Sequence, residues 1–394
     1  TLPASVADPF EYLRENAGLK SIQPLYGAAA SPERGVLSAR RASASVLASV
    51  TGDRRFPDTL RGVNLLHLDP KKITPQLLKH LAASPAFAIV ERAPARWLSA
   101  TAVDPQLNRQ WGLRAIRWFQ ERLPDAERVG VAILDSGLDV KHPDFKNARI
   151  TYEHGSFKAA DLIGHGTHVT GIIAGGVNNV QGAAGIAPCH IHAWKVFDDK
   201  PEDGEFFVDT EAFNAALAGA LEGDVRVVNM SLGGTESSQV ERLAIRELQN
   251  AGRLVVAAMG NEFDEGNPVE FPAAYDDVVA VGAVDAAGRR AEFSNTGRHI
   301  SLVAPGVGIL STLPTRASIA RDETDYAAWD GTSMATPHVA AVAALMFAKF
   351  PDLTHDQARK RLLKATRRLP GMKSSGRSES LGNGLIDVEL ALRD

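Results

Sequence analysis

The sequence predicts an α/β protein, a doubly wound and mostly parallel sheet preceded by a small α+β domain. Three observations support this. From about residue 101 onward, apolar runs of strand length alternate with segments of helical periodicity. These runs are apolar at nearly every position, as in strands buried on both faces. The first 100 of the 394 residues have a different pattern and the opposite net charge. We therefore expect two domains, residues 1–100 and 101–394.

The first hundred residues indicate a small unit of helices and strands. Thr74 followed by Pro75 is typical of the first residues of a helix. Residues 28–62 are rich in Ala, Ser and Arg with weak periodicity, so they give no firm prediction. The predicted elements are a helix at 9–18, a strand at 65–68, a helix at 75–84 and a strand at 86–90.

The second unit reads as alternating strands and helices. Ligands of such sheets bind beyond the carboxyl ends of the strands, so residues at strand ends are the candidates for a site. The predicted strands are 129–135, 226–232, 253–259 and 278–284, and the predicted helices are 209–221, 237–252 and 332–350.

Composition excludes several classes of function. The chain has 43 Lys and Arg against 47 Asp and Glu, a net charge of −4, so nucleic acid is not an expected partner. The one cysteine, Cys189, excludes an internal disulfide. The most apolar run, 339–348, is too short to span a membrane. The chain begins at Thr1 without a signal-like segment, so any targeting segment is absent from it. We expect a secreted or periplasmic protein, with the cytoplasm as the alternative.

Three segments place reactive side chains at element ends. Asp135 ends a predicted strand and is followed by a turn through Gly137. His165 opens a helix of small residues, where its imidazole can face Asp135. Ser333 lies near the start of a buried helix, whose backbone N–H groups stabilise an anion. Together they suggest an orienting acid, a base and a nucleophile.

The segments VAILDSGLDV, GHGTHVTGIIAG and DGTSMATPHVA resemble the Asp, His and Ser signatures of the subtilisin family of serine peptidases, in the family's chain order. The resemblance runs from about Asp104 to the C-terminus. It implies a subtilisin-like fold and a serine endopeptidase acting on proteins or peptides. His165 would take the proton of Ser333, Asp135 would orient the imidazole, and Asn261 would donate to the oxyanion beside the Ser333 N–H.

Other readings of these residues remain. His165 and His168 could form half of a metal site, but no third ligand with suitable spacing follows. An esterase would be expected to carry a G-x-S-x-G turn, which is absent around Ser333. The alternative from another class is a catalytically silent or permanently autoinhibited subtilisin-like binding protein. Retention of all four expected catalytic residues argues against it.

The resemblance also implies a substrate groove. The segment VNMSLGG resembles the family's strand that pairs with the peptide backbone. In the loop 261–272, Glu270 aligns with the floor of the primary pocket and Glu262 with its rim, which predicts a preference for Arg or Lys before the scissile bond. That these acids only solvate a loop is equally compatible with the sequence. The expected substrate-binding residues are Ser231, Leu232, Gly233, Gly234, Glu262 and Glu270.

Calcium is the expected ion. The segment 176–188 resembles the family's metal loop, in which backbone carbonyls join one Asn side chain and carboxylates from elsewhere. Six oxygen ligands suit calcium. The other reading is an ordinary turn with a helix cap. The expected ligands are Asp104, Asp144, Val177, Asn179, Gln181 and Ala183.

The segment ASPAFAIVERAP resembles the tail of a subtilisin propeptide, which implies that the first domain is a chaperone and intramolecular inhibitor. Residues 1–100 have 13 Lys and Arg against 8 Asp and Glu, and the rest have 30 against 39, so the two parts should attract. Self-cleavage would fall between Arg96 and Val103, with segment length favouring Ala100. The other reading is an appended interaction module. We expect a monomer.

Overall fold

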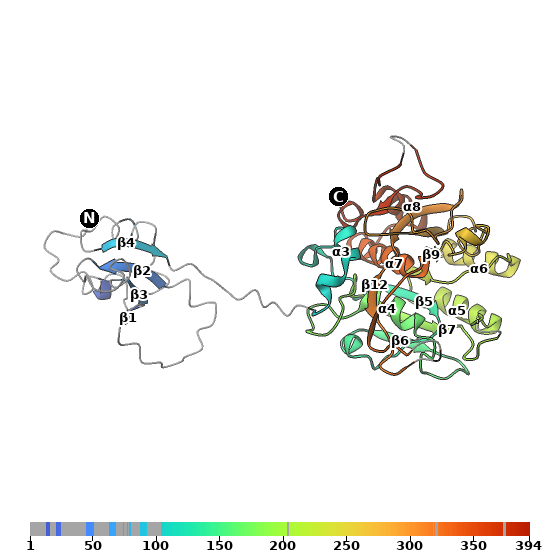
Figure 1. The fold of residues 1–394 in the computed structure, drawn as a ribbon, viewed down its shortest axis with the longest axis horizontal. Coiled ribbons are helices and arrows are strands. Elements are labelled where there is room, and N and C mark those ends of the chain that lie inside the picture. Colours follow the sequence, from blue (N-terminus) through green and yellow to red (C-terminus); the bar gives the residue numbers. More distant parts are fainter. Residues whose placement is uncertain are drawn as a thin grey trace. The chain divides into compact units, whose positions relative to one another are not determined.

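A computed structural model describes residues 13–15, 21–24, 45–50, 63–67, 74, 77, 79, 87–92 and 104–394, without 203, 204, 318, 320, 321 and 373–375. The chain divides into two compact units, Thr1–Ala100 and Thr101–Asp394, which are considered separately (Figure 1).

The first unit contains a four-stranded sheet in the order β1-β3-β2-β4, antiparallel throughout. The strands predicted at 65–68 and 86–90 correspond to β3 and β4, and the Thr74 hydroxyl accepts from Leu77 N at 3.1 Å, as an N-cap does. The pattern missed β1 and β2, of which β2 lies in the Ala- and Ser-rich region. The strands are β1 (Ser21–Pro24), β2 (Ser45–Val50), β3 (Val63–His67) and β4 (Phe87–Arg92).

The second unit is built on a nine-stranded sheet in the order β14-β15-β11-β10-β9-β8-β5-β7-β6, parallel except between β14 and β15. The doubly wound α/β fold is therefore confirmed. The strands are β5 (Gly130–Asp135), β6 (Ile150–Glu153), β7 (His190–Lys195), β8 (Val227–Met230), β9 (Leu254–Ala258), β10 (Val279–Val284), β11 (Ile300–Pro305), β14 (Thr366–Arg367) and β15 (Leu385–Ile386), with a separate antiparallel pair β12 (Ile309–Thr312) and β13 (Tyr326–Trp329).

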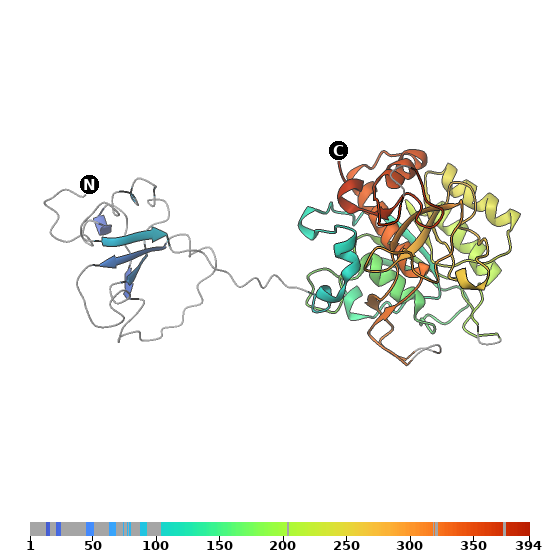
Figure 2. The same ribbon diagram turned by 45° about the horizontal axis from the view of Figure 1, so that its top comes forward.

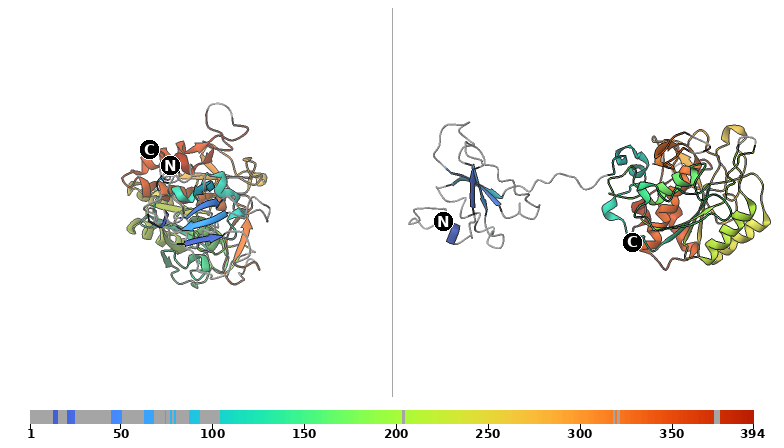
Figure 3. Two further views of the ribbon diagram at one scale, coloured as in Figure 1. Left: turned by 90° about the vertical axis from the view of Figure 1, so that its left-hand side faces the viewer. Right: turned by 90° about the horizontal axis from the view of Figure 1, so that it is seen from below.

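Helices cover both faces of this sheet (Figure 2 and Figure 3). Alternate residues of β5 show the division, because Val131 and Ile133 join the core under α4 and α7, whereas Ala132 and Leu134 join the core under α5 and α6. The helices are α3 (Trp111–Ala115), α4 (His165–Ala174), α5 (Thr210–Glu222), α6 (Gln239–Asn250), α7 (Thr332–Lys349), α8 (His355–Lys364) and α9 (Val388–Ala391). Short 3-10 turns occupy Leu107–Arg109, Gln120–Arg122, Pro143–Phe145 and Phe263–Glu265.

Helix α7 is buried nearly all round, which explains its continuous apolar and small-residue sequence. It packs against α4 and against β8 to β11. None of the helices in the described part of the chain has both the length and the apolar character that crossing a membrane requires.

The strand order fixes the place of the site. Strand β5 lies between β7 and β8. The strands that follow β5 in the chain are added first on one side of it, as β6 and β7, and then on the other side, as β8 and β9, so the winding of the sheet reverses at β5. A sheet of this kind opens a crevice at the carboxyl end of such a strand. Asp135 is the last residue of β5 and therefore lies at this crevice.

Candidate active site

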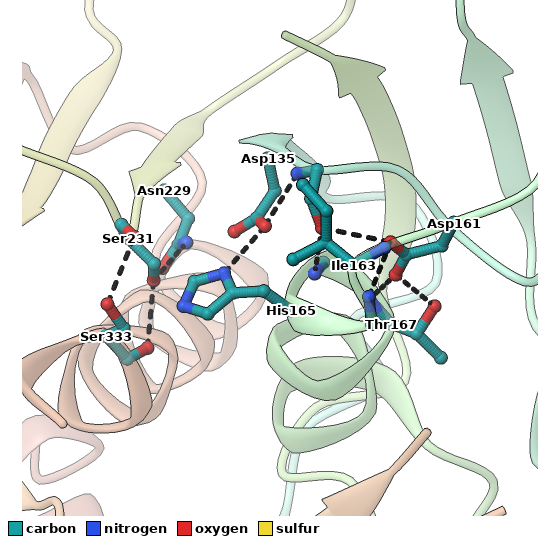
Figure 4. A network of polar contacts seen from close by, with 11 residues as sticks. Asp135, Asp161, Ile163, His165, Thr167, Asn229, Ser231 and Ser333 are labelled. Carbon is teal, nitrogen blue, oxygen red and sulfur yellow. Dashed lines mark hydrogen bonds and ion pairs between the residues drawn. The ribbon is translucent and has the colours of Figure 1, made fainter. Parts of the chain in front are cut away.

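Asp135 and His165 form the best-defined contact of the crevice. The Nδ1–H of His165 donates to Asp135 Oδ1 at 2.7 Å, and the N–H of Ser136 donates to the same oxygen at 2.7 Å. Asp135 is buried, whereas a quarter of the His165 side chain is exposed. The hydrogen bond leaves the second ring nitrogen on the side of Ser333 (Figure 4).

Ser333 lies in the first turn of α7 and is tied to the end of β8. Its Oγ donates to the carbonyl of Ser231 at 3.1 Å, and Ser231 Oγ donates to the carbonyl of Ser333 at 2.9 Å. Asn229 Nδ2 in turn donates to Ser231 Oγ at 3.0 Å. Figure 4 shows the His165 ring between Asp135 and Ser333. Transfer of the hydroxyl proton to His165 requires the O–H to turn away from Ser231.

Asn261 follows β9 and meets the residue before Ser333. Its Oδ1 accepts from Thr332 N at 2.8 Å and from Thr332 Oγ1 at 3.0 Å. Because the oxygen is held in this way, the amide nitrogen is the end that can donate into the adjacent cavity. That cavity has a volume of about 530 Å³ and is lined by His165, Asn261, Ser333 and Met334 among others. Sequence reasoning missed Thr332, whose partner is 71 positions away.

The expected substrate segment runs from the end of β8 to Gly234. Gly234 pairs with Phe271 in both directions, at 3.0 and 2.8 Å. A Cβ on Gly233 would lie 2.4 Å from Glu270 Oε2, and one on Gly260 would lie 2.1 Å from Glu270 Oε1. Both glycines therefore leave room for the Glu270 carboxyl, and Leu232 lies half-buried between Ser231 and Gly233.

Glu262 and Glu270 meet around Asn295. Asn295 Nδ2 donates to Glu262 Oε2 and to Glu270 Oε1, each at 3.1 Å, and the N–H of Asn261 donates to Glu262 Oε2 at 2.6 Å. Burial, together with a hydrogen bond and the charge of Glu262, raises the pKa of Glu270 to about 8. Burial opposes ionisation of Glu262 too, but its hydrogen bonds, that with Glu270 first, lower its pKa overall. The pair thus shares one proton near neutral pH, and sequence reasoning missed Asn295.

The other acids of this loop differ in environment. Asp264 and Glu265 are exposed, whereas Glu270 is 6% exposed. Solvation of a loop therefore describes the first two and not Glu270. Met259 is buried in the core under α5 and α6.

The expected calcium loop folds around two buried carboxylates. Asp144 accepts from Asn179 Nδ2 at 2.9 Å and from Ala183 N at 3.1 Å, and Asp104 accepts from the N–H groups of Asn178 and Asn179. Asn179 Oδ1 accepts from Gln181 N at 2.8 Å. The donor set is rich in the hard oxygens that calcium prefers. The Asn179 amide, however, turns its nitrogen toward Asp144, so joint coordination requires the amide to turn over.

Clusters of metal-binding side chains are a separate matter. The described residues contain no group of three or more His, Cys, Asp or Glu side chains placed to bind one metal ion. His168 Nε2 donates to the carbonyl of Ala327 at 3.1 Å and the ring stacks on Trp329 at 4.7 Å, so His168 packs under β13 rather than beside His165. The reading of His165 and His168 as half of a metal site gains no support.

An α/β domain with an Asp, His and Ser side chain at one crevice is characteristic of serine hydrolases. Residues 126–384 match the model of the subtilase family, Peptidase S8. The chain is 37% identical over 270 residues to Subtilisin DY of Bacillus licheniformis, covering 67% of this chain and 90% of that protein. It belongs to the subtilase family and is a serine endopeptidase that acts on protein or peptide substrates.

The matches to two further proteins cover more of this chain than its second unit. Alkaline elastase YaB of Bacillus sp. (strain YaB) is 33% identical over 340 residues, covering 85% of this chain and 82% of that protein. The crystal structure of fervidolysin from Fervidobacterium pennivorans, a keratinolytic enzyme related to subtilisin, matches with a TM-score of 0.66 and 25% identity. That match covers 90% of this chain and 58% of that chain.

Thr332 gives a test of the Asn261 geometry. Thr332→Val keeps the N–H that binds Asn261 Oδ1 but removes the hydroxyl, which donates to Asn261 Oδ1 and accepts from Gly260 N at 3.2 Å. A neutral hydrogen bond contributes about 1 kcal/mol, so we expect kcat for a chromogenic peptide to fall about fivefold with KM unchanged. Thr336→Val is the matched control, because its hydroxyl bonds only the carbonyl of Thr332 within α7. An unchanged kcat in Thr332→Val would contradict an orienting role.

Proposed function

We propose that this endopeptidase cleaves peptide bonds with Asp135, His165 and Ser333 as a catalytic triad. The hydrogen bond of 2.7 Å between Asp135 and His165, with Ser333 on the other side of the imidazole, carries this proposal. His165 removes the Ser333 proton as the oxygen attacks the substrate carbonyl, and then protonates the leaving amine. Asp135 holds the tautomer and stabilises the imidazolium.

Asn261 and the N–H of Ser333 are proposed as donors to the oxyanion. The contact of Asn261 Oδ1 with Thr332 supports this, because it directs the amide N–H₂ away from α7 and toward the cavity. Donors fixed before the reaction need no reorganisation as charge develops on the carbonyl oxygen.

The substrate is proposed to bind as an added strand along residues 231–234. The Ser333 hydroxyl donates to the carbonyl of Ser231. When the hydroxyl turns to donate to His165 instead, that carbonyl becomes available to accept from an N–H of the substrate. Gly233 and Gly234 are exposed and allow close approach of a peptide backbone.

Glu270, with Glu262, is proposed to select Arg or Lys before the scissile bond. The carboxyl of Glu270 is buried against Gly233 and Gly260. These glycines belong to the two segments that flank the expected pocket. A cationic side chain favours the ionised form of this pair and releases its shared proton.

The first unit is proposed to be a propeptide that inhibits and assists folding of the second. The relative from strain YaB and the fervidolysin structure support this, because each matches more of the chain than the second unit contains. Opposite net charges of the two parts also favour docking. The expected cleavage segment, Arg96 to Val103, and its favoured point at Ala100 lie outside the described residues. A secreted or periplasmic monomer accords with these assignments.

Calcium is proposed to bind Asp104, Asp144 and Asn179 together with the carbonyls of Val177, Gln181 and Ala183. The ion would supply a positive charge between carboxylates that the fold brings together. Its role would be to hold the loop 176–188 against the segment around Asp104.

Self-cleavage tests the triad and separates it from the catalytically silent alternative. Wild-type protein should release its first unit, with a new N-terminus between Arg96 and Val103 found by mass spectrometry. Ser333→Ala should retain the intact chain and lose peptide hydrolysis, whereas Ser238→Ala, at the N-cap of α6, should behave as wild type. An intact, inactive wild type would favour the silent alternative, and release in both would indicate an external protease.

The pH dependence of selectivity tests Glu270. Because its pKa is about 8, the carboxyl is protonated at pH 6 and ionised at pH 9. The ratio of kcat/KM for Arg-ending over Phe-ending peptides should therefore rise between these pH values, while any ionisation that affects both substrates equally cancels from the ratio. Glu270→Gln should remove the rise, and Glu265→Gln, in the exposed part of the loop, should keep it. A Phe preference at every pH would overturn the assignment.

Chelation tests the calcium site. Calcium present at 100-fold above its Kd stabilises the folded state by about 2.7 kcal/mol, which corresponds to a Tm higher by roughly 5 °C in a domain of this size. EGTA should remove this increment from the Ser333→Ala protein, in which autolysis is absent. Asp144→Asn should be insensitive to calcium. An equal Tm with calcium and with EGTA would contradict the site.

A further inference from the structure

Asp161 is a buried carboxylate beside the site that sequence reasoning did not single out. It lies four residues before His165 and is 4% exposed. Its Oδ1 accepts from Ser136 Oγ at 3.0 Å, Ile163 N at 3.2 Å and Gly164 N at 2.8 Å. Its Oδ2 accepts from Thr167 N at 2.9 Å and Thr167 Oγ1 at 2.6 Å. Burying a carboxylate is costly unless it is hydrogen-bonded, and five donors satisfy this one. Asp161 is therefore a structurally specific part of the fold.

One set of these bonds fixes the start of α4. The residue at the N-cap position is Gly164, which has φ +92° and no side chain to cap the helix. Asp161 replaces the missing cap, because it accepts from the N–H of Thr167 in the first turn. His165 is the first residue of that turn, so the carboxylate of Asp161 fixes the backbone position from which the imidazole extends.

A second set of bonds reaches the turn after Asp135. Ser136 Oγ donates to Asp161 and accepts from Gly166 N at 2.9 Å, while Ser136 N donates to Asp135 Oδ1. A Cβ on Gly166 would lie only 2.1 Å from the carbonyl oxygen of Gly137, so helix and turn are in direct backbone contact. Figure 4 shows Asp161 on the far side of this junction from Ser333.

The segment before Asp161 is anchored independently. Lys195 Nζ, at the end of β7, donates to the carbonyls of Lys158 and Ala160 and pairs with Asp199. These bonds do not involve the Asp161 side chain. A change at Asp161 should therefore alter the contacts to Ser136 and α4 while the approach of the chain stays in place.

We infer that Asp161 is a positioning residue that fixes His165 relative to Asp135. It acts on His165 through its bonds to Gly164 and Thr167, and on Asp135 through its bond to Ser136. The inference rests on the proposed triad. Asp161 is absent from the lining of the cavity that holds His165, Asn261 and Ser333, so it does not meet the substrate there. Its loss slows the chemical step and leaves substrate binding intact. A misplacement of about 1 Å can lower the rate of such a step about 100-fold.

Asp161→Asn provides the test, since an amide nitrogen presents a donor where one carboxylate oxygen accepted. We expect kcat for a chromogenic peptide to fall roughly 10- to 100-fold, with KM within about threefold of wild type. The rate of phosphonylation of Ser333 by a small fluorophosphonate should fall in parallel, because that reaction needs His165 but not the substrate groove. Both are measured well below the Tm.

Asp209→Asn is the matched control. Asp209 caps α5 by accepting from Ala212 N at 2.7 Å, so the same substitution replaces a carboxylate by an amide at a helix cap away from the site. Its kcat should equal that of wild type even where its Tm falls. If Asp161→Asn also lowers only the Tm, with kcat unchanged, Asp161 is a structural cap and the inference is overturned.

Ser136→Ala keeps the inference testable if Asp161→Asn does not fold. It removes the link between Asp161 and the turn, and we expect a several-fold fall in kcat with KM unchanged; an unchanged kcat overturns the inference. Failure of the triad itself is distinguishable, because Ser333→Ala would then keep full activity. If wild type is active, Ser333→Ala inactive and both positioning variants normal, only the role of Asp161 is lost.

Discussion

The burial of one carboxylate at the end of β5 is the constraint on which the site depends. Asp135 is 1% exposed, and both of its assigned hydrogen bonds, from His165 and from Ser136, fall on Oδ1. Its Oδ2 is buried with no hydrogen-bond partner among residues 104–394 as described. A carboxylate solvated this incompletely interacts strongly with any positive charge beside it. The negative charge of Asp135 therefore favours an imidazolium at His165, which is the ion that the proposed proton transfer from Ser333 would form.

Four strands of the second unit could be predicted from the sequence because burial on both faces makes them apolar at nearly every position. Strands β5, β8, β9 and β10 are apolar on both faces and were predicted within one or two residues. Strand β7, with the sequence HIHAWK, was missed because His190, His192 and Trp194 alternate with buried residues and lie half-exposed. In the first unit, β2 lies in a stretch of small residues that pairs with β3 and β4 through its backbone, which no side-chain pattern reveals.

The site divides in the same way. Asp135, His165 and Ser333 stand at element ends, so sequence order and resemblance were enough to bring them to one crevice. Thr332, Asn295 and Asp161 were missed, because what matters about each is a partner remote in the chain or a cap displaced from its usual position. Asp161 lies three residues before the N-cap Gly164, whereas a cap is sought at the N-cap itself. Of the residues expected to bind calcium, Asp144 and Asn179 are in contact, yet the orientation of the Asn179 amide is a rotameric detail that no sequence pattern carries.

The proposed oxyanion donor, Asn261, is linked by hydrogen bonds to the proposed specificity residues, Glu262 and Glu270, and this link bears on how selectivity would be expressed. Glu262 Oε2 accepts from the N–H of Asn261 at 2.6 Å and also from Asn295, which holds Glu270. A change of charge on the carboxyl pair therefore acts directly on the backbone of Asn261, while the side chain of that residue is the proposed donor to the reacting carbonyl. Binding energy gained from a cationic side chain in the pocket can then be used to order the oxyanion donor. On this argument, a well-matched substrate differs from a poor one in kcat as well as in KM, because the pocket is linked to the chemistry through one residue.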